Sequence, residues 1–343
     1  MNRTIDREAY LTYARALTGK ERDLLREFQE WLPDTIIDCH AHCNLPEHVR
    51  SIDDRAYHHM LSTFPSFSLE ESREWHKLLH PGKHILSLRF PKTFRGIDHR
   101  AANLYLLKQS DAQDRIALYG LPDDPEYTIG MLGYPRVSAL KMYYSYLEPP
   151  ATEIYQYFPK VVLEVAQSRD VPIVLHPPRR ITMCLDQILT LAKDFPRLRV
   201  CLAHLSLTKS IVPGLEEAFV EIARLPHIHF DTALVPSAEV VEMALQIVGT
   251  ERIMYGSDEP LNMIRSTPYV HPEKGERLAV EYPYHWVDKV DYQVYKHLAI
   301  GITHAHWQAL QAVKTAVSSL PEKERGAAKQ KLFHDNAKQF YGF

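Results

Sequence analysis

Hydrophobic and polar positions change their spacing along the chain in a regular succession. A helical pattern with charges on one side covers residues 6–32 and ends at Pro33. Beyond it, short apolar runs rich in β-branched residues predict eight strands, at residues 35–39, 84–90, 115–119, 137–142, 172–175, 198–203, 228–231 and 252–255. The longer segments between them have helical spacing and predict helices at residues 98–110, 152–168, 184–195, 213–225 and 237–248, with a weaker pattern at 123–132.

This alternation of strand and helix predicts parallel βαβ units, and eight such units close into a (β/α)8 barrel of the TIM type, within the α/β class. The rival arrangement is a doubly wound open sheet, which normally carries a glycine-rich turn after its first strand. Here the first strand is followed by HAHCNLPEH, which contains no glycine. The sequence therefore favours the barrel.

Two segments are longer than an ordinary loop between a strand and a helix. Residues 43–83 follow the first predicted strand and residues 259–300 the eighth, so both are expected at the carboxyl end of the barrel. Long ordered loops in a compact domain are usually lids or binding loops. Because the sequence shows no linker, repeat or low-complexity tract, we expect a single domain over residues 1–343, with a helical extension at 1–33 and the barrel at 34–343.

The composition excludes several classes of protein. The 343 residues are 45% hydrophobic and 24% charged with a net charge of -3, which is typical of a globular enzyme or binding protein. No basic patch or long apolar run is present, so we expect no binding to nucleic acid or to a membrane. Four scattered cysteines and no leader-like segment predict a cytoplasmic protein without a disulfide framework; association into a homo-oligomer is left open.

Histidine is the unusual residue, with 19 copies, several of which follow apolar runs. In TIIDCHAHCN, residues 35–44, strand alternation puts Asp38, His40 and His42 on one face and Cys39 on the other. At the end of a barrel strand that face points into the mouth, where two imidazoles can bind one ion of the zinc type from the same side. Nothing in the spacing recruits Cys43.

The same His-Ala-His triplet recurs at His304 and His306, in a segment with helical spacing. Two residues apart on a helix is a rotation of roughly 200°, so these side chains diverge and cannot share an ion. We interpret them as surface or capping histidines.

Polar residues with metal-binding side chains follow three further predicted strands. His176 follows the fifth strand, His204 the sixth, and Asp258 lies just beyond the eighth. Each one alone is as readily a strand-end side chain with a structural role. Their occurrence at successive strand ends, together with His40 and His42, predicts a shared metal site at the mouth of the barrel.

The order Asp38-x-His40-x-His42, His176, His204 and the Asp258 of a Gly-Ser-Asp triplet resembles the amidohydrolase superfamily, in its "amidohydrolase 2" branch of metal-dependent hydrolases and decarboxylases. The resemblance runs from the first strand to the C-terminal DNAKQFYGF and includes DHRAANLYLL, with Asn103, which is similar to the second helix of that branch.

The resemblance implies that His40, His42, His176 and Asp258 hold a divalent metal, with zinc expected and manganese as an alternative. His204 is then a ligand of a second metal or the residue that polarises substrate or water. Chemistry supports these roles, because a divalent ion lowers the pKa of its bound water towards ~7. An aspartate in contact with both the metal and the water can move the proton to the leaving group, which makes Asp258 and His204 the predicted catalytic residues.

Four further residues are predicted to contact the substrate. We expect a small molecule, and basic residues among the four would suit an anionic one. Lys141 ends the fourth strand and is open to three interpretations: a carboxylated bridge between two metals, a partner of a substrate carboxylate, or an ordinary strand-end lysine. Arg179, beside Arg180, follows the fifth strand, and Arg89 ends the second; either can grip an anion. Tyr143 is predicted to line the pocket.

Three functions are compatible with these residues. The first is metal-dependent hydrolysis of a C–O or C–N bond in a lactone, ester or amide. The alternative is non-oxidative decarboxylation of an aromatic or unsaturated carboxylic acid. A barrel that only binds ligands is disfavoured, because the predicted ligand set is complete.

Overall fold

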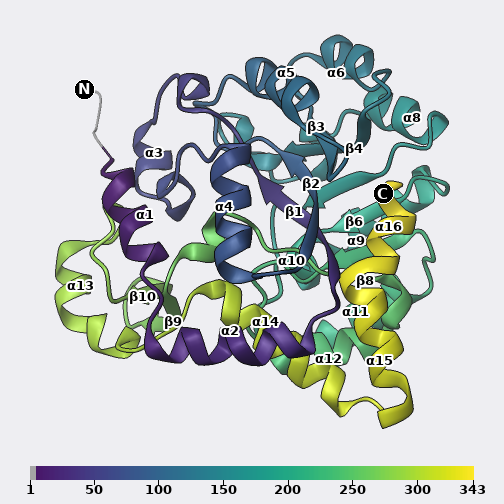
Figure 1. The fold of residues 1–343 in the computed structure, drawn as a ribbon. Coiled ribbons are helices and arrows are strands. Elements are labelled where there is room, and N and C mark those ends of the chain that lie inside the picture. The colour runs from purple at the N-terminus through teal and green to yellow at the C-terminus, as the bar shows by residue number, and fades with distance from the viewer. Residues whose placement is uncertain (1–4) are drawn as a thin grey trace.

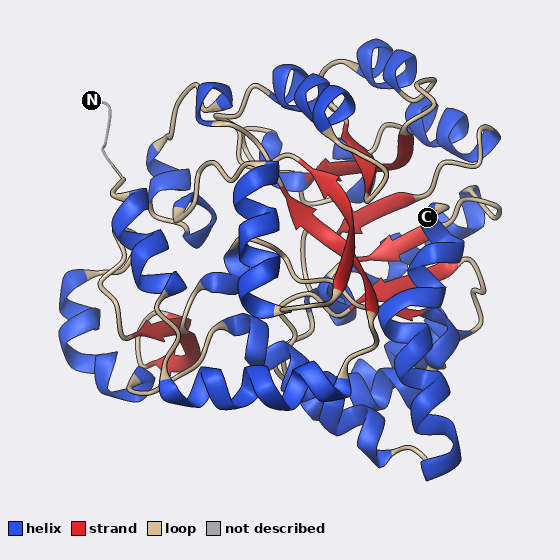
Figure 2. Cartoon of the chain, in the orientation of Figure 1, coloured by secondary structure: helices blue, strands red, loops and turns tan. Residues whose placement is uncertain are grey.

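Eight parallel strands form the centre of the computed structural model, which describes residues 5–343. They are hydrogen-bonded in sequence order, from β1 to β8, and are surrounded by helices (Figures 1 and 2). The strands are β1 Thr35–His42, β2 His84–Phe90, β3 Asp114–Tyr119, β4 Val137–Tyr143, β5 Ile173–His176, β6 Val200–Leu202, β7 Ile228–Asp231 and β8 Ile253–Met254. The predicted (β/α)8 barrel and its eight strands are confirmed.

The barrel closes between its first and last strands. The main-chain N–H of Cys39 donates to the carbonyl of Tyr255 over 3.0 Å, and that of His42 donates to the carbonyl of Glu259 over 2.8 Å. Ala41 and Glu259 also form an isolated parallel bridge. Closure matters for the site, because it brings the residues after β8 against the end of β1.

Small and branched side chains fill the inside of the barrel. The buried interior cluster contains Ile37, Cys39, Leu88, Phe90, Ala117, Ala139, Val174, Cys201, Ala203 and Met254. Phe340 and Tyr341 of the last helix, α16 (Asn336–Tyr341), belong to the same cluster, so this helix packs against the interior of the barrel. Residues on the outer faces of the strands pack against the surrounding helices in a second, larger core.

Most of the connecting helices lie where helical spacing predicts them, but the predicted helix at 152–168 is divided into two and the short helix at His204–Leu207 was not predicted. They are α5 His99–Gln109, α6 Pro125–Met131, α7 Ile154–Tyr157, α8 Lys160–Ser168, α9 Ile181–Asp194, α10 His204–Leu207, α11 Leu215–Ala223 and α12 Ala238–Ile247. After the barrel come α14 Ala305–Ser319, α15 Glu322–Gln330, a π-helix at Lys331–Asp335 and α16. Among residues 5–343, no helix combines the length and the apolar character that crossing a bilayer requires.

The N-terminal helical pattern forms two helices, α1 Arg7–Arg15 and α2 Gly19–Trp31. Thr18 begins the second with a reciprocal capping box to Glu21, which explains the break in the predicted run. Residues 1–4 of the predicted extension lie outside the described part of the chain.

Both long insertions have secondary structure of their own. The one after β1 contains α3 Asp54–Tyr57 and α4 Leu69–Leu79. The one after β8 contains the antiparallel hairpin of β9 Ser266–His271 and β10 Gly275–Val280, followed by α13 Lys289–Tyr295. In Figure 1 the hairpin and α13 lie beside α1, away from the barrel strands.

Candidate metal centre

A cavity of about 230 Å³ lies at the carboxyl ends of the strands and collects most of the predicted site residues. It is lined by His40, His42, His176, His204, Asp258, Lys141 and Tyr143, and also by His59, Met60, Leu61, Thr93, Tyr144, Leu207, Lys209, Leu234 and Leu261. Side chains from β1, β4 and β5 and from the segments that follow β1, β2, β6, β7 and β8 therefore converge on one space.

A β-bulge in β1 changes which residues face that space. The β1–β2 register shifts between Asp38 and Ala41, where two residues of β1 stand against Leu88 alone. As a result Cys39 packs inside the barrel and His40 lines the cavity. Asp38 is buried elsewhere, and its carboxylate accepts the main-chain N–H of His40 over 3.0 Å and of Ser257 over 2.8 Å. The expectation that Asp38 shares the face of His40 and His42 is wrong, because strict alternation does not hold across a bulge.

The four imidazoles that follow from the barrel strands, those of His40, His42, His176 and His204, are each held through the nitrogen Nδ1. Three of these nitrogens meet main-chain carbonyl oxygens: His42 with Pro91 at 3.0 Å, His176 with Pro177 at 3.0 Å and His204 with Ala233 at 2.8 Å. A carbonyl oxygen only accepts hydrogen bonds, so these nitrogens carry the proton. In a neutral ring the other nitrogen, Nε2, is then an acceptor, which is the state that binds a metal.

Asp231, at the end of β7, holds the fourth imidazole and was missed in the sequence analysis. Its Oδ2 lies 2.9 Å from Nδ1 of His40, and its Oδ1 accepts the main-chain N–H of His204 over 2.8 Å. Burial would raise the pKa of Asp231, but the adjacent His40 and His204 outweigh it and lower that pKa to about 2. The signal was available, because Asp231 is the last residue of a predicted strand and His176 directly follows one.

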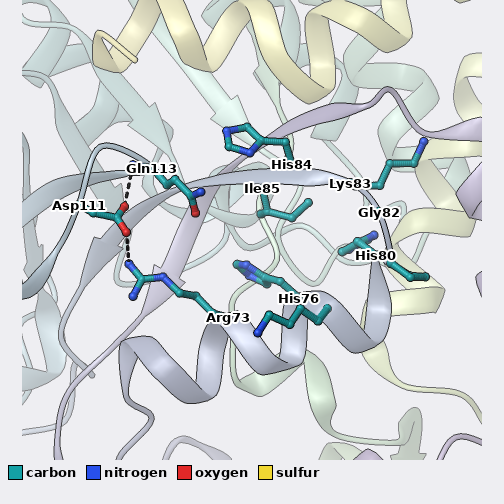
Figure 3. A pocket seen from close by; sticks show the side chains of 11 residues that line it. Arg73, His76, His80, Gly82, Lys83, His84, Ile85, Asp111 and Gln113 are labelled. Atoms are coloured by element: carbon teal, nitrogen blue, oxygen red, sulfur yellow. Dashed lines mark hydrogen bonds and ion pairs between the residues drawn. The ribbon is translucent and has the colours of Figure 1, made fainter.

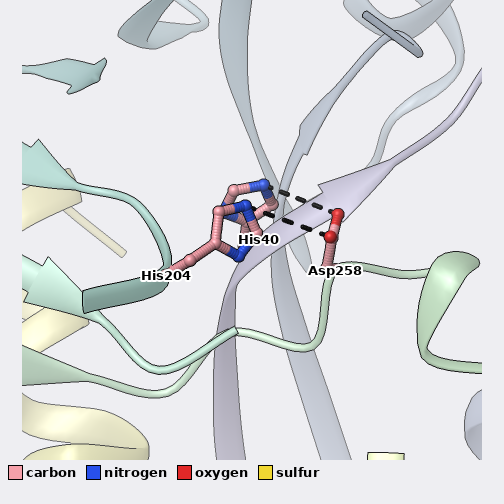
Figure 4. Close-up of side chains that lie close together, drawn as sticks. All are labelled: His40, His204 and Asp258. Carbon is pink, nitrogen blue, oxygen red and sulfur yellow. Dashed lines mark ion pairs between the residues drawn. The ribbon is translucent and has the colours of Figure 1, made fainter. Parts of the chain in front are cut away.

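Asp258 stands at the centre of the acceptor nitrogens. Its Oδ1 lies 3.0 Å from Nε2 of His42 and 3.7 Å from Nε2 of His40, and its Oδ2 lies 4.0 Å from Nε2 of His204. Figure 4 shows the carboxylate facing the rings of His40 and His204. One ligand atom from each of these three residues lies within 4.8 Å of the others.

This donor set fits a divalent metal. The pKa values of His42 and His204 fall to about 4, chiefly because both rings are buried. The pKa of Asp258 is well below its usual range, because the neighbouring imidazoles outweigh the effect of burial. Neutral nitrogens and an ionised carboxylate thus present lone pairs to one another at 3.0 to 4.0 Å. Two ligands that each lie about 2.0–2.1 Å from zinc are separated by roughly 3.0–3.5 Å, so a cation between them turns this repulsion into attraction.

His204 sits on a left-handed turn. His204, Leu205, Ser206 and Leu207, which form α10, have φ values of 58°, 45°, 57° and 59°. Each such residue costs roughly 1–2 kcal/mol relative to the right-handed form. Stored backbone strain of this kind is typical of functional sites, and here the turn places both His204 and Lys209 at the cavity.

Lys141 and Tyr143 line the cavity from β4. Lys141 is fully buried and its Nζ has no hydrogen-bond partner among the described residues. Burial lowers the pKa of Lys141 to about 8, although the nearby carboxylates of Asp231 and Asp258 act in the opposite direction. The hydroxyl of Tyr143 lies 3.3 Å from Nε2 of His176. Both residues are placed where a substrate would be bound.

The two predicted arginines lie outside the cavity. Arg89 is buried on the outer side of β2, where its Nε donates to Asp114 over 3.0 Å and its Nη1 to Glu259 over 3.0 Å. Arg179 is exposed before α9 and is absent from the cavity wall. Neither position fits the predicted contact with substrate, because Arg89 is already paired and neither side chain lines the cavity.

The second His-Ala-His triplet has a structural role. His304 precedes α14 and lies against Glu21, with 3.1 Å between Nδ1 and Oε1, whereas His306 packs against His80. The two rings diverge as predicted and share no metal cluster within residues 5–343. Both are buried, so the surface alternative of the prediction is wrong, whereas His304 does occupy the N-cap position of α14.

A larger hollow, of about 640 Å³, lies on the outer wall between α4 and the start of β2 (Figure 3). Its charged side chains are paired within the protein: Arg73 with Asp111 at 2.8 Å, Lys77 with Glu74 at 2.8 Å and Lys83 with Asp34 at 3.2 Å. It is remote from the carboxyl ends of the strands, so we place the functional site in the smaller cavity.

Comparisons with known proteins identify a family and a fold. A family model described as amidohydrolase matches residues 37–343. No curated protein matches the sequence. Solved structures with the same fold include a zinc-bound amidohydrolase from Burkholderia multivorans, with 13% identity, a TM-score of 0.58 and coverage of 90% of this chain and 99% of the other.

Two further solved structures have different activities in their names. The 5-carboxyvanillate decarboxylase of Sphingomonas paucimobilis has 13% identity and a TM-score of 0.57, with 91% of this chain and 100% of the other covered. A probable 2-pyrone-4,6-dicarboxylic acid hydrolase from Acinetobacter baumannii has 14% identity and a TM-score of 0.57, with 90% and 99% covered. At this identity the likeness shows the fold and leaves the reaction open.

Proposed function

Because the chain belongs to the amidohydrolase family, whose model spans residues 37–343, we propose that it is a metal-dependent hydrolase of a small molecule, cleaving a C–O or C–N bond in a lactone, ester or amide. The observation that carries this proposal is the buried Asp258 carboxylate, which faces three imidazole nitrogens across 3.0 to 4.0 Å. Such a group is a proton acceptor at the place where water must be activated.

His40, His42, His176 and Asp258 would hold the metal, with His204 beside them. When bound there, a divalent ion supplies Lewis-acid charge that stabilises negative charge on the reacting group and makes water a better nucleophile. Zinc is the expected ion, and manganese suits the same nitrogen and oxygen ligands.

Asp258 moves the proton in this proposal. Its ionised carboxylate takes a proton from the attacking water and then delivers it to the leaving oxygen or nitrogen. His204 assists as an acceptor, because its Nδ1 proton is donated to the carbonyl of Ala233 and its Nε2 is free. In this tautomer His204 orients a water hydrogen or binds the metal, and it does not donate to a substrate carbonyl.

Lys141 and Tyr143 position the substrate. The unpartnered ammonium of Lys141 is available to a substrate carboxylate or to a developing oxyanion, which would satisfy a buried donor. The phenol of Tyr143, beside His176, supplies a second hydrogen bond from the same strand.

Decarboxylation of an aromatic or unsaturated acid is the second candidate. Two observations favour it: the buried Lys141 fits a carboxylate next to the imidazoles, and several structurally similar proteins are decarboxylases by name. In this alternative Asp258 takes a proton from water and delivers it to the carbon that the carboxylate leaves as CO₂, so that one hydroxide is formed for each CO₂ released.

The two reactions release different products. Metal-loaded protein would be offered a panel of lactones, esters and hydroxylated aromatic acids, with proton release and CO₂ release measured in parallel, and a panel of cyclic amides, whose ring opening would be followed by chromatography. We expect proton release without CO₂, and its loss by at least about 10³-fold in Asp258→Asn. CO₂ release from an aromatic acid would contradict hydrolysis and support decarboxylation, the second candidate. Absence of bound metal, with no turnover on adding zinc or manganese, would reject both.

A further inference from the structure

A group of charged side chains lies on the outer side of β2, beside the segment that follows β8. Nη1 of Arg89 donates to Oε1 of Glu259 over 3.0 Å, and its Nε donates to Oδ1 of Asp114 over 3.0 Å. Nε2 of His76 lies 2.7 Å from Oε2 of Glu259. Arg89, Asp114 and Glu259 are exposed by 5% or less, whereas His76 is partly exposed. These four residues form the outer ionic cluster.

Stability alone does not explain charges at this depth. Taking charged groups out of water is costly, and replacing a buried ion pair by apolar side chains of similar volume is often neutral or stabilising. In several proteins such groups instead fix one arrangement of the parts that they join. The parts joined here are α4, β2, β3 and the segment after β8, which carry His76, Arg89, Asp114 and Glu259 in that order.

Glu259 is the member of the cluster that connects it to the cavity. It directly follows Asp258, which lines the cavity, whereas α4, β2 and β3 contribute no residue to the cavity wall within residues 5–343. The side chain of Glu259 lies on the other side, where it lines a small hollow with His76 and Asp38. Two successive carboxylates therefore face opposite sides of the same stretch of main chain.

The main chain at Asp258 has a conformation that needs support from its surroundings. Asp258 has a φ of 58°, in the left-handed region that a residue with a side chain rarely adopts. Its N–H donates to the carbonyl of His40 over 2.8 Å, and the carbonyl of Glu259 accepts the N–H of His42 over 2.8 Å. These bonds fasten the segment to β1. Relaxation of Asp258 to the right-handed form would redirect the chain at Glu259, so a fixed side chain at Glu259 opposes it.

The position of the Asp258 carboxylate depends on this main chain, because the side chain is short. Its Oδ1 lies 3.0 Å from Nε2 of His42 and 3.7 Å from Nε2 of His40. Metal ligands have to be held to within about 0.5 Å of the productive geometry by residues that are themselves fixed. The segment is also packed closely on β1, since a Cβ at Gly256 would lie 2.8 Å from Cβ of His40. A displacement at Glu259 would therefore change the distances between the ligands.

We propose that Glu259 is a positioning residue of the candidate metal centre. Its carboxylate, held by Arg89 and His76, fixes the main chain of Asp258 and thereby the distances from the Asp258 carboxylate to the imidazoles. It does so without contact with metal or substrate. Arg89, which the sequence places among the substrate contacts, acts in this arrangement from the outer side of the barrel. The inference rests on the proposed function only for a divalent ion at the imidazoles, and not for the reaction.

A matched pair of variants separates positioning from general stability. Glu259→Gln and Asp114→Asn each remove one of the two buried carboxylates that Arg89 contacts and keep the shape of the side chain. Without the Asp114 charge, Arg89 retains Glu259 as its carboxylate partner, so the segment after β8 keeps its anchor. His76→Gln replaces the other partner of Glu259 at a partly exposed position, and it tests the same contact if Glu259→Gln does not fold.

Cobalt(II), bound in place of zinc, provides the readout. Its visible absorption bands depend on the number and arrangement of its ligands, and its dissociation constant is measured by competition with a chromogenic chelator. We expect Glu259→Gln to change the bands and raise the dissociation constant by about 10–100-fold, whereas Asp114→Asn should stay within about twofold of the wild type. The bands of Asp114→Asn should match those of the wild type. His76→Gln should change both quantities in the direction of Glu259→Gln, by a smaller amount.

The outcomes separate this inference from the proposed function. Wild-type bands and affinity in both Glu259→Gln and His76→Gln would overturn the positioning role. Equal changes in Glu259→Gln and Asp114→Asn, or a wild-type protein that binds no cobalt, would also overturn it. A change confined to Glu259→Gln and His76→Gln, without any turnover of the substrate panel, would keep the positioning role and reject hydrolysis. Turnover of the panel with wild-type cobalt binding in these two variants would do the reverse.

Discussion

At the scale of single residues, the second partner of each imidazole decides what that imidazole can do. Main-chain carbonyls of Pro91, Pro177 and Ala233 fix the protons of three rings, and Asp231 fixes the fourth. Such partners hold the ring orientation and raise the basicity of the free nitrogen. The cavity is therefore organised for a cation before any cation arrives.

The two His-Ala-His triplets provide a matched pair of variants. We expect His40→Ala to lose the bound metal, because it removes an acceptor from the cluster with His204 and Asp258. His306→Ala should keep one equivalent, since that ring packs against His80 outside the cavity. Metal content of the purified variants, measured by elemental analysis, checks both. Loss of metal in His306→Ala would contradict the separation of the two triplets.

Asp231 influences metal affinity through its contact with His40 and not by direct contact with a metal. Asp231→Asn keeps the shape of the side chain and removes its charge, so metal affinity should fall by about 10–100-fold. Competition with a chromogenic chelator measures this change. Asp186→Asn, on an exposed face of α9, serves as the control and should bind metal as the wild type does. Equal affinities for the two variants would reject the role of Asp231.

The residues at strand ends were predictable and those in loops were not. His176, His204 and Asp258 each follow an apolar run, so a local pattern and the barrel topology suffice to bring them together. Arg89 also ends a strand, but it faces outward and pairs with Asp114 and Glu259. Which face a strand-end residue takes depends on register and bulges, and these are set by tertiary pairing that no local pattern records.

At the scale of elements, α2 is fastened to the insertion after β8 by a buried ion pair. Nε and Nη2 of Arg265 donate to the two carboxylate oxygens of Glu21, over 2.8 and 2.7 Å, and both side chains are almost fully buried. The main-chain N–H of His304 donates to the same carboxylate over 2.8 Å. This contact ties the N-terminal helices to α14 and to the hairpin.

Removing one partner of that pair should be costly. Glu21→Gln leaves Arg265 charged and buried without a counter-charge, which typically costs about 3–5 kcal/mol of unfolding free energy. Glu27→Gln removes a half-exposed partner of Lys314 and should cost about 0–1 kcal/mol. Urea unfolding of the two variants measures the contrast. Similar losses in both would show that the buried pair contributes no more than a surface pair.

The same carboxyl group predicts a loss of stability in acid. Although burial raises the pKa of Glu21, its contacts with Arg265 and His304 lower that pKa to about 2, from an ordinary value of 4.5. A lowered folded-state pKa stabilises the fold above the ordinary value, and this contribution disappears as the pH falls through 4.5 towards 2. The difference in unfolding free energy between the wild type and Glu21→Gln should shrink over that window. A difference that stays constant down to pH 2.5 would contradict this assignment.

The insertions illustrate the limit of prediction at this scale. Their length after β1 and β8 indicated binding loops, and residues of the first, His59, Met60 and Leu61, do line the cavity. The hairpin and α13 inside the second could not be placed from the sequence, because the connection between them packs on α1 through Tyr282 and Tyr284, which contact the distant Tyr10.

At the scale of the whole molecule, the same barrel fold supports several reactions. The fold therefore indicates the family, whereas the substrate is determined by the residues of the loops. Bound metal should nevertheless stabilise the entire fold. A ligand present at about 1,000 times its dissociation constant adds about 4 kcal/mol to the native state alone. We therefore expect chelation to lower the melting temperature and reloading with zinc to restore it. His40→Ala should melt at the same temperature with and without chelator; a chelator effect that persists in this variant would point to metal bound elsewhere.

The left-handed turn of α10 joins two positions on the cavity wall. It places His204 beside Asp258 and, two residues after its end, Lys209 on the same wall. A sequence change that returned this turn to the right-handed form would displace both side chains at once. The candidate metal centre and the charge at the cavity wall are therefore coupled through one stretch of main chain, and neither can be altered there without the other.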